Sequence, residues 1–446
     1  MSMRLDHTHD LAAKSWLESA NDDDASFPLQ NLPFAVFRRA GTAEAFRGGV
    51  ALGDQVIDLT RVVEAGGFSG LAAQAASACA QPTLNGFLAM GADAWRALRH
   101  ALFDRFKAQD ERERAGPGVA ALKRCLVPQA DVEYGLPMQI GDYTDFYTSI
   151  DHARNIVNLL RPDGSLSPNF QWMPLAYHGR VSSIGLSGQP IRRPLGQRLP
   201  TGQREPELAP CARLDYELEL GIFIGAGNEQ GTRIPVARAE EHVFGLCLLN
   251  DWSARDIQSW ESVPLGPFLA KNFATTLSPW IVTMDALAPF RGAWTRPSGD
   301  PQPLPYLCAP ETPAYGALDI QLEVALETAN HRRNGIAPTR LSRTSFRHQY
   351  WTVAQMVAHH TVGGCNLRSG DLLGSGTVSG PTRAEAGALI ELTEAGKTPV
   401  RLPTGETRSF LEDGDAVVMT GWCERTGYAR IGFGESRGEI LPAHGE

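Results

Sequence analysis

The chain has 446 residues, of which 43% are hydrophobic and 20% are charged, and its formal net charge is −9. The length and the apolar content exclude a single small module and wholesale disorder, and they allow two or three domains. An acidic chain is not expected to bind nucleic acid or an anionic membrane, because both partners require a surface with clustered Lys and Arg.

The chain also shows no membrane or secretion signal. No run approaches the ~18 consecutive apolar residues that a membrane span requires, and residues 1–10 include no apolar signal-peptide run. The seven cysteines include no CxxC pair, which indicates free thiols in a reducing compartment. We therefore expect a cytoplasmic protein with no membrane and no nucleic-acid partner.

Composition divides the chain into segments. The first residues, including Asp22-Asp23-Asp24, carry little apolar content, which is typical of a mobile or loosely packed arm. The polar stretch ERERAGPG at 111–118 resembles a linker. We expect a mobile N-terminal arm over 1–25, an N-terminal domain over 26–125 and a larger C-terminal domain over 126–446.

The N-terminal domain begins with strand-like runs and continues with helical spacing. A first run covers 34–37, and two alternating segments over 48–59 are separated by Gly53-Asp54, which predicts a β-hairpin. Residues 71–108 are rich in Ala, Leu and Arg with helical spacing and predict helices.

In the C-terminal domain, Gly and Pro separate short strand-like runs, and this pattern predicts a mainly β fold. Two helices are predicted, over 146–160 and 352–361. Regular βαβ alternation is absent, which argues against a doubly wound sheet. Strand-like runs cover residues 184–191, 214–224, 244–249, 280–283, 318–326, 389–394 and 416–420.

One predicted strand carries three acidic residues on a single face. Asp215, Glu217 and Glu219 alternate with apolar residues, so their side chains lie on the same side of the strand. Like charges at this spacing repel one another, and a hard divalent cation with oxygen ligands would relieve the repulsion. A solvated edge face explains the pattern equally well from this strand alone, since most carboxylates are exposed.

Further polar clusters favour the cation. Residues 142–147 combine acidic and aromatic side chains just before His152, and residues 250–256 follow an apolar strand, where binding loops tend to lie. Lys271 lies in the apolar run 267–275, where its ammonium either finds a partner or extends to solvent. The three acidic segments together supply oxygen donors for a cation cage.

Six long blocks of sequence resemble one family. They are DYTDFYTSIDH at 142–152, YHGRVSSI at 177–184, DYELE at 215–219, NDWSARDIQSWE at 250–261, PLGPFLAKNFATT at 264–276 and GSGTVSGP at 374–381. In this order they resemble the fumarylacetoacetate hydrolase (fumarylacetoacetase) family, and within it the enzymes of tyrosine catabolism. The resemblance implies a small SH3-like N-terminal barrel, a large C-terminal β-roll domain and a homodimer.

The resemblance also implies an activity. Family enzymes use a divalent cation, Mg or Ca with Mn as a third choice, to hydrolyse the carbon–carbon bond of 4-fumarylacetoacetate. The products are fumarate and acetoacetate, and the reaction is the last step of tyrosine and phenylalanine (homogentisate) catabolism. The partner implied is thus a small dicarboxylate diketone.

The family's site residues carry over one position at a time. Those around the metal match Asp145, Glu217, Glu219, Asp251, Lys271 and Thr275. The catalytic ones match His152 as the water-activating base, Glu391 as its partner, and Arg255, Gln258 and Lys271 as stabilisers of developing charge. The substrate-binding ones match Tyr147, Arg161, Tyr177, Gln258 and Thr377.

One acidic residue is left without a role, one position departs from the family, and two alternatives stay open. Asp215 shares the acidic face but has no metal role in the family, and Ser262 stands where animal members have Tyr. A related acylpyruvate hydrolase, oxaloacetate decarboxylase or enol-acid isomerase would use the same fold and metal, as would a non-catalytic cation-binding protein. The presence of both His152 and Glu391 favours hydrolysis, because a lyase depends on the metal more than on a water-activating pair.

Overall fold

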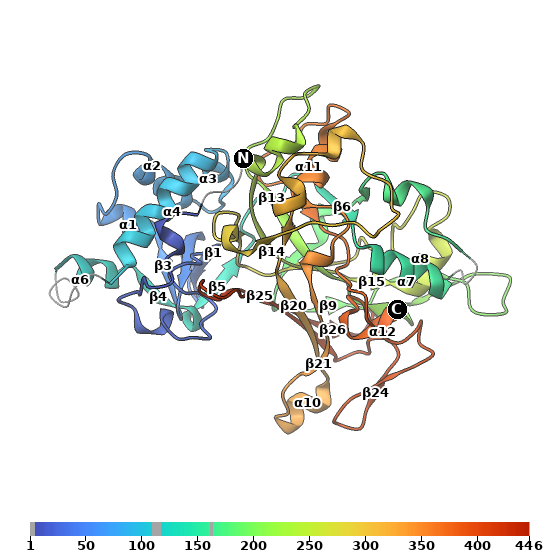
Figure 1. The fold of residues 1–446 in the computed structure, drawn as a ribbon. Coiled ribbons are helices and arrows are strands. Elements are labelled where there is room, and N and C mark those ends of the chain that lie inside the picture. The colour runs from blue at the N-terminus through green and yellow to red at the C-terminus, as the bar shows by residue number, and fades with distance from the viewer. Residues whose placement is uncertain (1–4, 109–116, 161–163, 446) are drawn as a thin grey trace.

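The computed structural model describes residues 5–108, 117–160 and 164–445. It contains a smaller N-terminal unit and a larger C-terminal unit that lie side by side (Figure 1). The fold is sheet-rich but mixed, because helices accompany the strands in both units. Most of the expected linker, residues 111–118, lies outside the described residues.

The N-terminal unit is built on a five-stranded antiparallel sheet in the order β4-β3-β2-β1-β5. Its strands are β1 (Phe34–Arg39), β2 (Arg47–Leu52), β3 (Gln55–Asp58), β4 (Leu126–Pro128) and β5 (Val132–Gly135). The predicted hairpin is confirmed as β2 and β3, joined at Gly53, whose φ of +55° suits glycine. Strand pairing carries this sheet to Gly135, beyond the boundary expected after residue 125.

Helices cover this sheet. They are α1 (Leu59–Glu64), α2 (Gly70–Cys79), α3 (Asn85–Leu88), α4 (Ala92–Phe106) and α6 (Pro117–Lys123), so the helical prediction for 71–108 is confirmed as three helices. In α4, Trp95, Leu98, Leu102 and Phe106 recur at helical spacing and are buried. The segment expected to be a mobile arm packs on α4 through η1 (His7–His9), where Thr8 is fully buried.

The C-terminal unit contains a large sheet in the order β7-β6-β22-β13-β14-β16-β8, with β17 also paired to β14. Every residue of the two central strands β13 and β14 is buried. This explains their nearly continuous apolar sequence, since both faces of the sheet are covered. The strands are β6 (Tyr143–Tyr147), β7 (Leu175–His178), β8 (Ile184–Leu186), β13 (Leu218–Ile224), β14 (Val243–Asp251), β16 (Thr275–Leu277), β17 (Val282–Thr283) and β22 (Leu372–Gly374).

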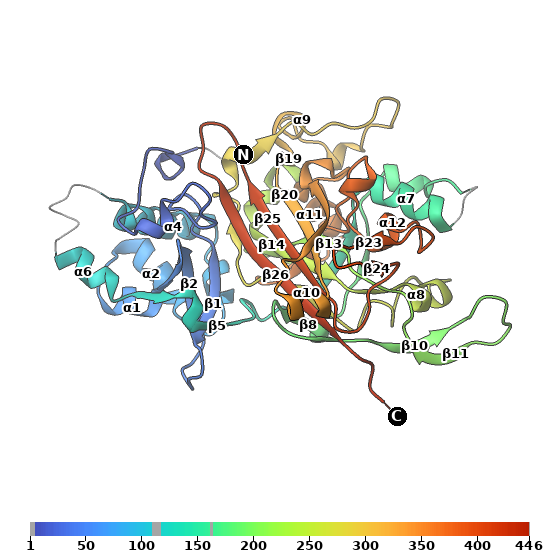
Figure 2. The same cartoon turned by 90° about the horizontal axis from the view of Figure 1, so that it is seen from below.

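A second, five-stranded sheet has the order β21-β20-β25-β26-β9. Figure 2 shows β25 and β26 as its long antiparallel pair, and both strands contact β14 of the large sheet. Its strands are β9 (Ile191–Arg192), β20 (Gln321–Glu327), β21 (Thr339–Ser345), β25 (Ala416–Cys423) and β26 (Ile431–Leu441). Short pairs complete the unit: β10 (Leu195–Arg198) with β11 (Glu207–Pro210), β12 (Leu214–Asp215) with β15 (Ser253–Ala254), β18 (Arg291–Gly292) with β19 (Ala317–Leu318), and β23 (Val400–Arg401) with β24 (Thr407–Arg408).

The helices of the C-terminal unit correct two predictions. Residues 389–394 were expected as a strand, which is wrong: they begin as helix α12, whose first N–H groups bind a distant carboxylate. The helix expected over 146–160 starts only at Ile150, because 146 and 147 belong to β6. The helices are α7 (Ile150–Leu160), α8 (Arg255–Glu261), α9 (Thr312–Tyr315), α10 (Ala329–Asn334), α11 (Val353–Thr361) and α12 (Leu389–Leu392).

The two units share an apolar core. Phe34 and Phe87 of the N-terminal unit and Phe244 of β14 form a ring cluster with centroid distances of 5.2 to 5.5 Å. The N-terminal unit is therefore packed directly against the large sheet. Within the described residues, no helix is both long enough and apolar enough to cross a membrane.

Candidate functional site

Three carboxylates meet at one edge of the large sheet. Asp145 comes from β6, Glu219 from β13 and Asp251 from the end of β14, and one oxygen of each lies within 4.8 Å of the others. Gly374 of β22 lies between β6 and β13 and pairs with Asp145. Because Gly374 has no side chain, the carboxylates can approach one another across β22. We call these three residues the carboxylate cage.

The carboxylate cage has the features of a cation site. All three residues are buried, and Asp145 Oδ1, Glu219 Oε1 and Asp251 Oδ1 have no hydrogen-bond partner among the described residues. Burial, together with repulsion from the neighbouring carboxylates, raises the pKa of Asp145 and of Glu219 well above the usual range. Unpartnered buried oxygens are costly, and a hard divalent cation bound by oxygens would satisfy all three. The residues present therefore fit such an ion.

Glu217 lies beside the carboxylate cage but is already paired. Its Oε1 accepts a hydrogen bond from Arg255 Nη1 at 2.7 Å, and its Oε2 accepts one from Lys271 Nζ at 2.5 Å. Burial raises the pKa of Glu217, but these two cations outweigh burial and hold it well below its ordinary value. Lys271 also donates to Asp251 Oδ2 at 2.6 Å. Lys271 thus links Glu217 to the cage, and Thr275 lies opposite Asp251 in the β14–β16 pair.

A buried His–Glu pair faces this group. His152 of α7 lies with Nδ1 2.7 Å from Glu391 Oε1, and its Nε2 lies 4.0 Å from Glu217 Oε1. Asn155 and Ser379 donate to the two oxygens of Glu391 at 2.7 and 2.9 Å. Burial raises the pKa of Glu391, but His152 and these donors outweigh it, so the carboxylate stays ionised. An ionised partner favours the tautomer with a proton on Nδ1 and leaves Nε2 free to accept one.

Arg255 is held in place by Asp215, a residue to which the sequence assigned no role. Asp215 Oδ2 accepts from Arg255 Nε at 2.9 Å, and the same carboxylate accepts the N–H groups of Leu389 and Ile390 at the start of α12. Asp215 therefore fixes both Arg255 and the helix that carries Glu391. In the sequence, the only indication of a role for Asp215 was its position on the acidic face of the predicted strand. Arg255 Nη1 also contacts Gln258 Oε1 at 3.2 Å, and its buried Nη2 has no hydrogen-bond partner in the described part of the chain.

The remaining predicted residues are distributed around the same centre. The Tyr177 hydroxyl lies 2.9 Å from Asp251 Oδ2 and 3.2 Å from Asp145 Oδ2, so it contacts the cage itself. The Tyr147 ring packs edge-on against His152, with 5.4 Å between centroids. Thr377 is buried just after β22. Arg161 lies outside the described residues.

Gly374 provides a direct test of the carboxylate cage. A Cβ at this position would lie 2.5 Å from Asp145 Oδ1 and 3.0 Å from Glu219 Oε2, so one carboxylate must move. We expect Gly374→Ala to weaken Mg²⁺ affinity by about tenfold or more, the range found when groups that orient metal ligands are disturbed. Isothermal titration with Mg²⁺ measures the effect. Gly292→Ala is the matched control, because it also lies in a strand and its Cβ would meet nothing within 4 Å; equal affinities of the two variants would contradict the cage.

Comparison with known proteins finds one family over most of the chain. Residues 143–440 match the family described as fumarylacetoacetate (FAA) hydrolase C-terminal, and residues 30–137 match fumarylacetoacetase N-terminal. The chain is 47% identical over 420 residues to the fumarylacetoacetase of Oryza sativa subsp. japonica, covering 94% of this chain and 95% of that one. It is 46% identical over 424 residues to the Homo sapiens fumarylacetoacetase, covering 94% and 97%. A solved fumarylacetoacetate hydrolase from Exiguobacterium antarcticum is 18% identical, covers 93% of this chain and 100% of its own, and has a TM-score of 0.48.

Proposed function

The chain belongs to the fumarylacetoacetate hydrolase family, and from this premise we propose that it hydrolyses 4-fumarylacetoacetate to fumarate and acetoacetate. The reaction is the last step of tyrosine and phenylalanine catabolism. The observation that carries the proposal is the buried His152–Glu391 pair facing a carboxylate cage with unpartnered oxygens. A protein that only bound or only decarboxylated through the cation would not need this pair.

Water activation is the role of His152. Its Nε2 takes a proton from water while Glu391 holds the other ring nitrogen, and the resulting oxygen nucleophile adds to the substrate carbonyl. The carbon–carbon bond then breaks, and its electron pair leaves as the enolate of acetoacetate. The proton on His152 is available to protonate the enolate carbon, which returns the base to its starting state.

Positive groups stabilise the charge that develops. Asp145, Glu219 and Asp251 would hold a divalent cation, with Glu217 as the fourth carboxylate beside them, and the bound cation would supply polarisation of the substrate carbonyls. The oxygen-only ligand set favours Mg²⁺ or Ca²⁺, with Mn²⁺ as a further choice. Because Arg255 Nη2 is a buried donor with no partner among the described residues, it is suited to the substrate oxyanion. Gln258, which contacts Arg255, and Lys271, which contacts Glu217 and Asp251, are proposed to assist.

Substrate recognition involves the side chains around this centre. Tyr147, Tyr177, Gln258 and Thr377 are proposed as substrate contacts, and Arg161 is proposed to pair with a substrate carboxylate. The proposal for Tyr147 is supported by the packing of its ring against His152. The Tyr177 hydroxyl also contacts two carboxylates of the cage, which places it at the edge of the same centre.

The decisive experiment follows the loss of ultraviolet absorption of the diketone in the presence of purified protein. We expect turnover with Mg²⁺ or Ca²⁺, loss of turnover after chelation, and recovery when the cation is returned, because three cage oxygens have no partner among the residues that the structure describes. Full turnover by metal-stripped protein would contradict the role of the cation. Turnover of oxaloacetate or an acylpyruvate, but not of fumarylacetoacetate, would instead identify a related enzyme on the same fold.

We also propose the finer features of the family for this chain. The five-stranded antiparallel N-terminal sheet supports an SH3-like barrel, and the two larger sheets support a β-roll catalytic domain. A homodimer is supported by the loop after α8, where Val263, Leu265 and Phe268 expose 79%, 96% and 68% of their surfaces. Seven free cysteines support a cytoplasmic location.

A further inference from the structure

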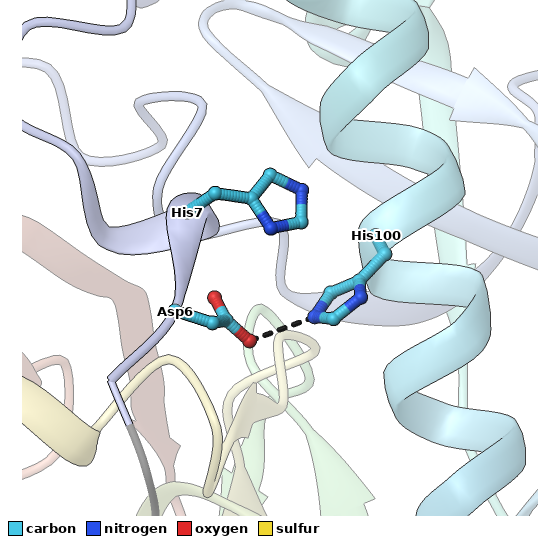
Figure 3. Close-up of side chains that lie close together, drawn as sticks. All are labelled: Asp6, His7 and His100. Atoms are coloured by element: carbon cyan, nitrogen blue, oxygen red, sulfur yellow. Dashed lines mark hydrogen bonds and ion pairs between the residues drawn. The ribbon is translucent and has the colours of Figure 1, made fainter.

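A second cluster of side chains that could hold a metal ion lies in the N-terminal unit, away from the carboxylate cage. Figure 3 shows Asp6 and His7 of the N-terminal segment pointing toward His100 of α4. One ring nitrogen of each histidine and one oxygen of Asp6 lie within 4.8 Å of one another. Asp6 and His100 also line a cavity of about 1110 Å³ between the N-terminal and C-terminal units, which gives an ion a route to the cluster.

The carboxylate of Asp6 is fixed in place before any ion arrives. Its Oδ1 accepts hydrogen bonds from the backbone N–H and the hydroxyl of Thr8 at 2.9 and 2.7 Å. Thr8 is fully buried and accepts a hydrogen bond from Arg99, which also donates to the carbonyl groups of Gln30 and Asn31. The remaining oxygen, Oδ2, lies 2.7 Å from His100 Nε2. The pair is therefore held in position by contacts that do not depend on a metal.

His7 has the outer contact that metal-bound histidines usually have. Its Nε2 lies 3.1 Å from Asp104 Oδ1, and Asp104 lies one turn after His100 on α4. A carboxylate at Nε2 favours the tautomer with a proton there and leaves Nδ1 with a free lone pair.

The neighbouring His9 has a structural role only, because both of its ring nitrogens contact the backbone. Its Nδ1 accepts the N–H of Asp6 at 3.0 Å, and its Nε2 lies 2.8 Å from the carbonyl oxygen of Asp285. Both ring nitrogens are used in holding the segment, so His9 has none left for a ligand. His7 and His100 differ, since neither has such backbone contacts on both nitrogens in the described structure.

We propose that Asp6, His7 and His100 form a binding site for Zn²⁺ or a similar transition-metal ion, which clamps the N-terminal segment to α4. Two imidazoles and one carboxylate suit Zn²⁺, Co²⁺ or Ni²⁺ rather than Mg²⁺ or Ca²⁺, which prefer oxygen ligands. The ion takes the place of the proton that His100 Nε2 shares with Asp6, and that proton moves to Nδ1 or to solvent. Asp104 acts as the positioning residue for His7.

The test uses full-length protein that is stripped of metal and then saturated with Mg²⁺, so that the oxygen cage holds the ion that it favours. Calorimetry measures Zn²⁺ binding, and visible absorption of bound Co²⁺ reports nitrogen ligation. We expect one Zn²⁺ per chain that excess Mg²⁺ does not displace. His100→Ala and Asp104→Ala should each weaken Zn²⁺ affinity by about tenfold or more.

Two control variants keep the result interpretable. His444→Ala removes an exposed histidine elsewhere, and Glu219→Gln alters the carboxylate cage; both should leave this Zn²⁺ affinity unchanged. Asp104 has a side chain that is 61% exposed, so its loss should not disturb folding, and circular dichroism verifies this. Absence of Zn²⁺ binding under saturating Mg²⁺, or an affinity that neither His100→Ala nor Asp104→Ala changes, would overturn the proposal.

Discussion

His152→Ala is expected to lower the turnover number for fumarylacetoacetate by about 10² to 10⁴, the usual contribution of a general base. The reason is geometric: His152 Nδ1 is held by Glu391 at 2.7 Å, and Nε2 is the ring nitrogen that faces the acidic centre. Absorbance at saturating substrate and Mg²⁺ measures the effect. The Mg²⁺ affinity should be nearly unchanged, because His152 is not part of the carboxylate cage.

Two further variants define the role of the pair. Glu391→Gln should reduce turnover less than His152→Ala, because the amide oxygen still accepts the Nδ1 proton but no longer stabilises a charged imidazole. His359→Ala, on helix α11, is the control and should retain normal turnover. A His152→Ala protein that is folded by circular dichroism and turns over normally would show that another group activates water.

Lys271→Met should produce the largest effect on stability. Lys271 is buried and donates to both Glu217 and Asp251, so its removal leaves two buried carboxylates with less compensation. Breaking a buried ion pair by removing one partner typically costs about 3–5 kcal/mol. We expect the free energy of unfolding of the metal-stripped protein, measured with urea, to fall by this amount. Turnover should also fall by about 10² to 10³, the cost of losing one preorganised donor.

The control for this variant is Lys397→Met, because Lys397 is exposed and its loss should change neither quantity. Adding Mg²⁺ to the Lys271→Met protein should recover part of the lost stability, since the cation binds only the folded cage. If stability and turnover both match those of the unaltered protein, Glu217 and Asp251 must obtain their compensation elsewhere, and Lys271 has no part in the centre.

The amino-acid sequence by itself determined the local features. The hairpin around Gly53 follows from a turn glycine between two alternating segments, and α4 follows from apolar residues at helical spacing. The motifs around Asp145, Glu219 and Asp251 identified the cage residues through the family resemblance. These signals depend on residues that are close to one another in the sequence, so they can be detected from the sequence alone.

The secondary structure predicted from the local sequence was wrong where a distant side chain binds the backbone. Residues 389–392 look like a strand, but the Asp215 carboxylate binds the N–H groups of Leu389 and Ile390, and the chain turns into α12. In the same way, the alternation over 214–224 suggested one continuous acidic face, yet the structure breaks it into β12 and β13. Asp215 then binds Arg255, whereas Glu219 joins the cage. Tertiary contacts thus override local preference in both segments.

Only the tertiary structure decided which carboxylates approach one another and which are paired with Lys or Arg side chains. Asp145 and Glu219 approach each other because β6 and β13 flank β22 in the sheet, and Gly374 leaves the space between them open. Glu217 is separated from this set by its bonds to Arg255 and Lys271. The order of strands in a sheet depends on segments that are distant in the sequence. The sequence therefore determined which carboxylates are available, and the sheet determined which of them meet.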